Sequence, residues 1–201
     1  MLRVGLTGGL ASGKSFVGHA LASLGCRLIE ADDLGHQVLL PGAEVYDGVV
    51  AEFGNGILDP DGRIDRRKLA AIVFEKPELL EKLNRLVHPA VVAREERLIA
   101  EIGRADPRAI AVVEAAILVE TGNYKKFDRL IVAACSLEQQ IERAMKRDGR
   151  TREEVTARLS RQLPLEDKVW VADYVIDTSG TKENTMEQVQ ALYGSLRGLS
   201  A

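Results

Sequence analysis

The sequence predicts an α/β fold in which helices cover both faces of a doubly wound parallel sheet. One observation is an apolar run over residues 2–6 that ends in glycines and is followed by a helical pattern over 15–24. Another is the pair of runs 110–113 and 130–134, which are apolar without polar alternation, as strands buried on both faces are. Helical stretches separate these runs and a last strand over 174–177, and such alternation is typical of doubly wound sheets.

The first strand leads into a phosphate-binding loop. Residues Gly8 to Ser15 fit the pattern G-x-x-x-x-G-K-[ST], which lies between a strand and a helix. Glycines let backbone N–H groups curl around phosphate oxygens, Lys14 supplies a positive charge, and the Ser15 hydroxyl can bind Mg²⁺. We therefore expect a nucleoside triphosphate site formed by Gly8, Gly9, Leu10, Ala11, Ser12, Gly13, Lys14, Ser15 and Phe16.

Acidic residues follow the expected strands. A short strand over 26–29 leads into Glu30, Asp32 and Asp33, at the sheet edge where α/β proteins bind ligands. A carboxylate here can cap a helix that we expect from about residue 33 to 40, and such a carboxylate beside the phosphate loop could also accept a proton from a substrate hydroxyl. Glu114 and Glu120 flank the end of the strand over 110–113, and either one supports Mg²⁺ or only a helix start.

A long helical region separates the second strand from the third. A helical pattern over 45–53 is followed by a turn-rich loop over 54–64. Helical periodicity then continues from residue 65 to about 103, with breaks expected near Pro77 and at His88-Pro89. We expect an insertion outside the sheet, over about 60–106, within a single domain that spans residues 1–201.

A basic helical hairpin follows the strand over 130–134. Residues 137–162 are helical except at 149–151, with Thr151 as the expected cap of the second helix and Glu154 as its capping-box partner. The stretch carries Arg143, Lys146, Arg147, Arg150, Arg152, Arg158 and Arg161. Such a run is either a solvated face paired with nearby acids or a lid, over about 138–166, that closes on a triphosphate.

The composition excludes several classes of protein. With 201 residues and a formal net charge of −3, the chain has room for one core and lacks the overall positive field of nucleic-acid binders. Cys26 and Cys135 match no metal or redox spacing and suggest reduced thiols in the cytoplasm. Met1 runs directly into the first strand, so we expect neither a signal peptide nor a membrane span. The oligomeric state stays open.

Beyond the loop, an ordered set of motifs resembles dephospho-coenzyme A kinases nearly from end to end. The matching pieces are Gly5-Leu-Thr-Gly-Gly with Ser12-Gly-Lys-Ser; Glu30-Ala-Asp with Pro41-Gly42; Phe53-Gly54 with Ile57-Leu58; Asp61-Gly62 with Arg66 and Leu69; Leu83-Asn84 with His88-Pro89; Ile117-Leu-Val-Glu120; Gln140 with Arg143 and Arg147; Gln162; and Ala172-Asp173 with Val175-Ile176. The loop is shared with many proteins, whereas the ordered set is shared with few.

This resemblance implies that the ATP γ-phosphate is transferred to the 3′-hydroxyl of dephospho-coenzyme A. It implies Asp32 as catalytic base, Lys14 and Ser15 as phosphate and Mg²⁺ ligands, and Arg143 and Arg147 as catalytic lid arginines. His88 lies in the insertion, which in the family faces the coenzyme A substrate. The chain departs from the family at Glu30, where Asp is usual, at Ala116, where Pro is usual, and at Thr178-Ser179-Gly180, where the turn usually holds Asn.

Two other classes compete with this interpretation. Another small-molecule kinase would share the loop and the lid without the motifs of the insertion. A GTP-dependent switch is suggested by Asp59-Pro-Asp-Gly62, which fits D-x-x-G, and by Thr181-Lys-Glu-Asn184, which is close to T-K-x-D. The first motif lies in a turn-rich loop, and the second ends in Asn, which lacks the carboxylate that accepts two guanine N–H groups.

Overall fold

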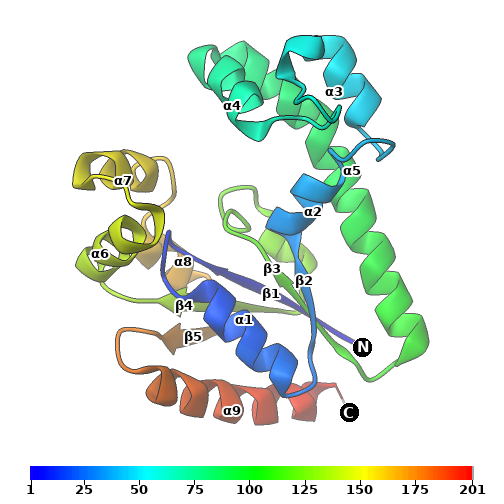
Figure 1. Ribbon diagram of the computed structural model, residues 1–201. Coiled ribbons are helices and arrows are strands. Elements are labelled where there is room, and N and C mark those ends of the chain that lie inside the picture. Colours follow the sequence, from blue (N-terminus) through cyan, green and yellow to red (C-terminus); the bar gives the residue numbers. More distant parts are fainter. Residues whose placement is uncertain (201) are drawn as a thin grey trace. The chain divides into compact units, whose positions relative to one another are not determined.

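The computed structural model describes residues 1–200, except for the side chains of Phe74 and Glu75. Two compact units are present (Figure 1): one consists of Met1–Glu30 with Ile99–Ala201, and the other of Ala31–Leu98. We describe each unit by itself.

The first unit is built on a parallel sheet of five strands. The strands are β1 (Leu2–Gly8), β2 (Arg27–Glu30), β3 (Ile110–Glu114), β4 (Arg129–Ala134) and β5 (Tyr174–Asp177), in the order β2-β3-β1-β4-β5. Every pair is parallel, and Glu30 at the end of β2 lies in register with Glu114 at the end of β3. The chain passes from β1 to one side of the sheet and returns to the other, which confirms the predicted doubly wound fold. Its ligand edge is therefore the carboxyl end of β1.

Helices cover the sheet on both faces. On one face, α1 (Lys14–Ser23) and α9 (Lys182–Leu199) pack side by side (Figure 1). Leu21 of α1 and Leu196 of α9 join Val4, Leu6 and Ile131 of the strands in the main core, and all five are fully buried. Leu130 points to the opposite face, where the segment after β3 with its 3₁₀ turn (Asn123–Lys126) and α8 (Leu165–Trp170) lie. This arrangement leaves the ends of the strands as the exposed edge.

The basic hairpin has two helices with clear capping signals. Helix α6 (Leu137–Asp148) starts at a capping box of Ser136 and Gln139 and ends at Gly149, which adopts the left-handed conformation that glycine tolerates. Helix α7 (Arg152–Leu159) starts at a capping box of Thr151 and Glu154, as the sequence predicts. Helix α8 begins after a segment over residues 160–164 and was missed, because six residues are too few to show a period.

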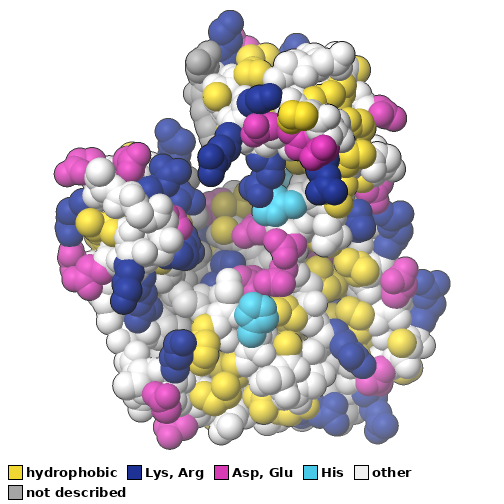
Figure 2. Space-filling view, viewed as in Figure 1, with side chains coloured by type: hydrophobic (Ala, Val, Ile, Leu, Met, Phe, Trp, Pro, Cys, Tyr) yellow, Lys and Arg dark blue, Asp and Glu magenta, His cyan; other side chains and the backbone are white. Residues whose placement is uncertain are grey.

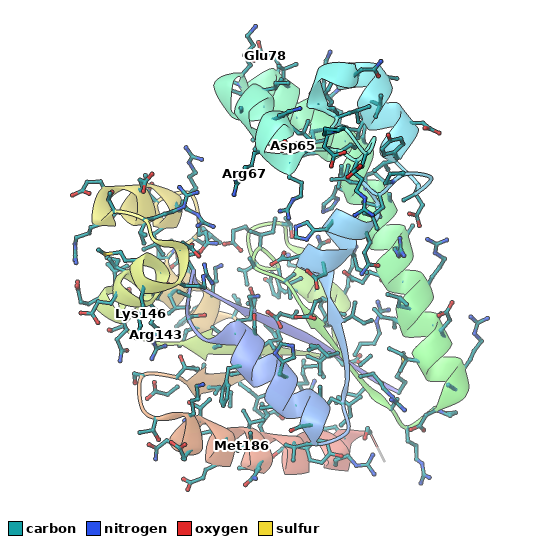
Figure 3. The ribbon with its side chains drawn as sticks, viewed as in Figure 1. Asp65, Arg67, Glu78, Arg143, Lys146 and Met186 are labelled. Atoms are coloured by element: carbon teal, nitrogen blue, oxygen red, sulfur yellow. The ribbon has the colours of Figure 1, made fainter. Side chains whose placement is uncertain are left out.

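The second unit is helical and has its own core. It contains α2 (Ala31–Gln37), α3 (Tyr46–Phe53), a 3₁₀ turn (Asn55–Ile57), α4 (Arg66–Glu75) and α5 (Pro77–Ala105) as far as Leu98. The Asp65 side chain caps α4 by accepting from the backbone N–H of Arg67 and Lys68 (Figure 3). Fully buried Val49 and Ile57 lie at the centre of its core, with Leu69 and Val73 against them.

Two expectations about helix boundaries are wrong. The helix after β2 begins at Ala31 rather than near Asp33, so both Asp32 and Asp33 lie in its first turn and Asp33 is not its cap. The break expected at His88-Pro89 is absent, because Pro89 lies inside α5. A proline removes one backbone hydrogen bond, and the packed side chains of Leu83, Leu86 and Val87 hold the helix together on its N-terminal side. The break near Pro77 is present, with proline at the first position of α5.

Candidate functional site

The phosphate loop connects the end of β1 to the start of α1. Ala11 and Gly13 adopt left-handed φ angles of 54° and 83°, and alternation of this kind turns successive backbone N–H groups toward one side. A Cβ added to Gly8 would lie 2.3 Å from Ser12 Oγ and 2.6 Å from the carbonyl oxygen of Ala133, so only glycine fits there. The loop has the backbone course that an anion site needs.

Lys14 and Ser15 meet on one carboxylate. Lys14 Nζ and Ser15 Oγ donate to Glu114 Oε1 at 2.6 and 2.7 Å, and Glu114 is 4% exposed at the end of β3. The other oxygen, Oε2, is buried and has no hydrogen-bond partner among the described residues. Of the two acids that flank this strand, the structure therefore joins Glu114 to the loop. Glu120 instead pairs with Lys168 Nζ at 2.6 Å.

Two adjoining cavities open at the loop. One, of about 570 Å³, is lined by loop residues Gly9 and Ala11 to Phe16 together with Arg143, Arg147 and Lys182. The other, of about 260 Å³, shares Gly13, Phe16, Arg143 and Lys182 with it and adds Thr178, Gly180, Thr181 and Thr185. Lys182 Nζ lies 5.8 Å from the centre of the Phe16 ring, which holds an aromatic face at the boundary. Gly8 and Leu10 belong to the same loop but line neither cavity.

The hairpin arginines occupy two kinds of position. Arg143 projects from α6 (Figure 3) and donates to the carbonyl oxygen of Thr178 at 2.7 Å, which ties α6 to the turn after β5. Arg147 makes two hydrogen bonds, of 2.7 and 3.1 Å, to Asp148. Arg158 Nη1 also reaches Asp148 Oδ2, at 2.9 Å. The hydrogen bond from Arg147, aided by both charges, holds the pKa of Asp148 below its usual value.

Acidic partners neutralise part of the hairpin's charge. Figure 2 shows Lys and Arg side chains mixed with acidic ones over α6 and α7. Arg152 pairs in a bidentate manner with Glu138, and Arg150 lies 3.6 Å from Glu154. Some arginines of the hairpin therefore pair with acids on a solvated face, while Arg143 and Arg147 line the loop cavity.

The second unit holds a separate cavity of about 640 Å³. Its polar members are Asp32, His36 and Arg66, and Leu39, Leu69, Val73, Leu80 and Leu83 supply most of its apolar wall. Asp33 does not line it; its carboxylate lies 3.6 Å from His36 Nδ1 and is largely exposed. His88 is exposed on α5 and is likewise not among the lining residues.

Glu30 belongs to the sheet unit. It lies 3.6 Å from His19 Nε2 of α1, in register with Glu114 on the neighbouring strand. No cluster of three or more His, Cys, Asp or Glu side chains that could hold a metal ion was found among the described residues. A divalent cation with oxygen ligands needs fewer protein groups, because bound phosphates and water complete its shell.

Several supports of the loop escaped the sequence analysis. Thr178 Oγ1 donates to the carbonyl oxygen of Ser12 at 2.6 Å, and the backbone N–H of Leu10 donates to Gln162 Oε1 at 3.0 Å. Lys168 is completely buried on α8 and donates to main-chain oxygens of Gly8 and Ala116. Thr178, Gln162 and Lys168 each lie more than 100 residues downstream of the loop residue that they contact. Lys168 also lies 52 residues from Ala116, so no local pattern reveals these contacts. Within α8 the sequence gives no signal either, because Lys168 follows two other charged residues, Glu166 and Asp167.

Within the described part of the chain, no helix combines the length and the apolar character needed to cross a membrane.

Comparison with known proteins agrees over nearly the whole chain. Residues 2–184 match the family model described as dephospho-CoA kinase. The dephospho-CoA kinase of Aquifex aeolicus is 43% identical over 196 residues, which cover 98% of each chain. A solved protein from Thermus thermophilus superimposes with a TM-score of 0.82 at 31% identity, over 97% of both chains. The dephospho-CoA kinase of Campylobacter jejuni gives a TM-score of 0.68 at 25% identity, over 96% of both. The chain belongs to the dephospho-CoA kinase family.

Proposed function

We propose that this protein transfers the γ-phosphate of ATP to the 3′-hydroxyl of dephospho-coenzyme A, which gives coenzyme A and ADP in the last step of coenzyme A synthesis. The observation that carries the proposal is the phosphate loop at the end of β1, where Lys14 and Ser15 meet on Glu114. Membership of the family supports the choice of acceptor.

ATP fits the two adjoining cavities of the first unit. The polyphosphate occupies the cavity lined by the loop, where backbone N–H groups and the N-terminus of α1 favour negative charge. The adenine occupies the smaller cavity between Phe16, Arg143 and the turn at Thr178 to Gly180. This places Thr178 and its neighbours at the base, although the turn lacks the asparagine that is usual in the family.

Ser15 and Glu114 are the residues that would hold Mg²⁺. The fit is supported by Glu114 Oε2, a buried oxygen without a partner among the described residues, on the same carboxylate that binds Ser15. One or two protein oxygens with phosphate oxygens and water make an ordinary Mg²⁺ shell. When bound, the ion would neutralise charge that develops on the phosphate oxygens. Lys14, on the same carboxylate, is held ready for the β- and γ-phosphates.

The cavity of the second unit suits the acceptor. Its apolar wall accommodates an uncharged arm, while Arg66 and His36 offer polar contacts at Asp32. We assign Asp32 the task of orienting the attacking hydroxyl and accepting its proton. His88 stays a predicted acceptor contact from elsewhere on α5 in the helical insertion expected over about 60–106.

The hairpin over about 138–166 acts as the lid. Arg143 and Arg147 line the phosphate cavity, and Arg147 is held there by Asp148. Triphosphate oxygens carry more charge than one carboxylate, so they compete with Asp148 for the Arg147 guanidinium when ATP is bound. When Arg147 exchanges Asp148 for the triphosphate, its positive charge lies beside the phosphoryl group that is being transferred. We place the reaction in the cytoplasm, in keeping with two free thiols, Cys26 and Cys135.

A coupled assay of ADP release tests the proposal. With ATP and Mg²⁺, the purified protein should release ADP only when dephospho-coenzyme A is added, and the product should carry phosphate on the 3′-oxygen. GTP should compete weakly with ATP, which separates the kinase from a GTP-dependent switch. Equal ADP release with shikimate, gluconate or a nucleoside as acceptor would instead favour another small-molecule kinase.

A further inference from the structure

Lys168 is a buried cation for which the reaction described above has no use. The side chain is 0% exposed, and it lies in α8 on the face of the sheet opposite α1 and α9. Its ammonium nitrogen lies 2.6 Å from Glu120 Oε1, 3.0 Å from the carbonyl oxygen of Ala116 and 3.3 Å from that of Gly8. An ammonium group has three protons, and three acceptors surround this one. Lys168 therefore has no donor left for a substrate.

The acceptors identify what Lys168 holds. Gly8 is the last residue of β1 and the first of the phosphate loop. Ala116 follows β3 two residues after Glu114, and its carbonyl oxygen also accepts from Thr7 Oγ1 at 3.2 Å. Lys168 thus connects the carboxyl ends of the neighbouring strands β1 and β3, from which the phosphate loop and the Glu114 carboxylate project.

The same cluster joins the loop to the end of the basic hairpin. Glu120 Oε1, the ion-pair partner of Lys168, lies 3.3 Å from the backbone N–H of Leu163. One residue earlier, Gln162 Oε1 accepts from the backbone N–H of Leu10 at 3.0 Å. The returning arm of the hairpin is therefore attached at Gln162 to the loop and at Leu163 to the carboxylate that Lys168 binds.

We propose that Lys168 is a positioning residue for phosphoryl transfer, which fixes the main chain at Gly8 and Ala116 so that the loop amides and Glu114 hold their places. Without its ammonium, two carbonyl oxygens lose a cationic partner, and Glu120 is left as a largely buried carboxylate whose charge is balanced, among the described residues, only by the backbone N–H of Leu163. The loop then relaxes, and misplacement of reacting groups by about 1 Å is enough to cost on the order of 10² in rate. The proposal rests on the proposed kinase function for its effect on turnover, but its effect on ATP binding does not depend on the acceptor.

The test compares three variants. Lys168→Met keeps a long side chain without donors, and Lys168→Met/Glu120→Gln also removes the carboxylate charge that would otherwise be left unpaired. Lys126→Met makes the same change at an exposed position of the first unit. Folding is checked by circular dichroism, ATP affinity by calorimetric titration without acceptor, and kcat and KM for each substrate in the coupled assay.

We expect both Lys168 variants to lower kcat/KM for ATP by on the order of 10²-fold and to weaken ATP binding, with KM for the acceptor unchanged. Lys126→Met should match the wild type. A lower melting temperature with wild-type kcat/KM for ATP would show a purely structural role and overturn the proposal. If neither Met variant folds, Lys168→Arg decides, since a planar guanidinium keeps the charge but cannot reproduce three convergent donors. Wild-type ATP affinity in that variant would overturn the proposal as well. If the Lys168 variants bind ATP more weakly, as expected, but even the wild type releases no ADP in response to dephospho-coenzyme A, only the proposed acceptor is refuted.

Discussion

Asp32 and Asp33 are neighbours on α2 whose surroundings differ. Both residues are exposed, but Asp32 lines the cavity of the second unit, whereas Asp33 does not and lies 3.6 Å from His36 Nδ1. Both lie in the first turn of the helix, so both interact favourably with its N-terminus, and that shared effect is small. A comparison of the two asparagine variants therefore isolates catalysis from helix stability.

We expect Asp32→Asn to lower kcat by about 10²–10⁴, the usual contribution of a general base. ATP affinity, measured by titration, should stay at the wild-type value because the loop is untouched. Asp33→Asn is the matched control and should keep most of its activity. The opposite ranking of the two variants would assign the base to Asp33.

Glu114 offers a second test at a single side chain. Glu114→Gln keeps the volume but removes the charge that Lys14 and Ser15 share. If Glu114 supports Mg²⁺, the Mg²⁺ concentration that gives half-maximal activity should rise by on the order of 10–100-fold. Glu101→Gln, an exposed substitution on α5, is the control. An unchanged Mg²⁺ dependence would limit Glu114 to holding Lys14.

Single side chains were predictable to the extent that their role is local. The loop from Gly8 to Ser15 shows its chemistry in consecutive residues, and both its strand and its helix lie where the pattern predicts. Glu114 was one of two open candidates, because the sequence does not show that β3 lies beside β1. Lys168 was missed, and Thr178 was noted only as part of a turn that departs from the family, since each reaches the loop from about 160 residues away.

At the scale of elements, the hairpin α6–α7 carries arginines in two different positions, at the phosphate cavity and on the solvated face. Both side chains are about half exposed, at 56% for Arg147 and 48% for Arg150, but only Arg147 lines the phosphate cavity, while Arg150 lies near Glu154. The two residues have the same chemistry and lie three positions apart, so they make a matched pair.

We expect Arg147→Ala to lower kcat by on the order of 10²–10³, since a donor that meets developing charge acts mainly in the transition state. Its melting temperature should change little, because Asp148 keeps Arg158 as a partner. Arg150→Ala should leave both kcat and the melting temperature close to wild type. Near-normal turnover of Arg147→Ala would make the hairpin an ordinary surface.

Helix ends were predictable where a side chain caps them. Thr151 and Glu154 form the predicted capping box, and Pro77 starts α5 as first-turn prolines do. Pro89 was misjudged because its local cost is outweighed by the packing of the rest of α5, which a local pattern does not report. The start of α2 was also misjudged, because this helix begins directly after β2 without a loop.

At the scale of the whole chain, the doubly wound sheet followed from the alternation of strands and helices, but the strand order did not. Buried strands of similar composition do not encode which neighbour each one takes, and the long-range pairings settle that choice. The helical region between β2 and β3 was expected as an insertion, and its division from the sheet at Ala31 and Leu98 emerges only from the contacts.

Cys26 links the stability of the sheet unit to alkaline pH. Burial in the main core, partly offset by the charge of Arg197, raises the pKa of the Cys26 thiol from 9.0 to about 11. Between these values the unfolded chain releases the thiol proton and the folded chain keeps it, so the free energy of unfolding falls as pH rises. Below pH 9 this contribution is constant.

We expect the melting temperature, measured by scanning calorimetry, to fall more steeply from pH 9 to 11 in the wild type than in Cys26→Ala. All other ionisable groups are the same in both proteins, so the difference between the two curves isolates the thiol. A constant difference across this range would contradict the assignment.

The chain has one tryptophan, and Trp170 is 88% exposed at the end of α8, two residues after Lys168. The molecule therefore contains a single indole, and that indole lies on the helix that binds the phosphate loop. Its fluorescence emission should resemble that of indole in water and should be quenched readily by iodide. A nucleotide-dependent shift in that emission or quenching would report on α8 alone, without any label and without interference from a second indole.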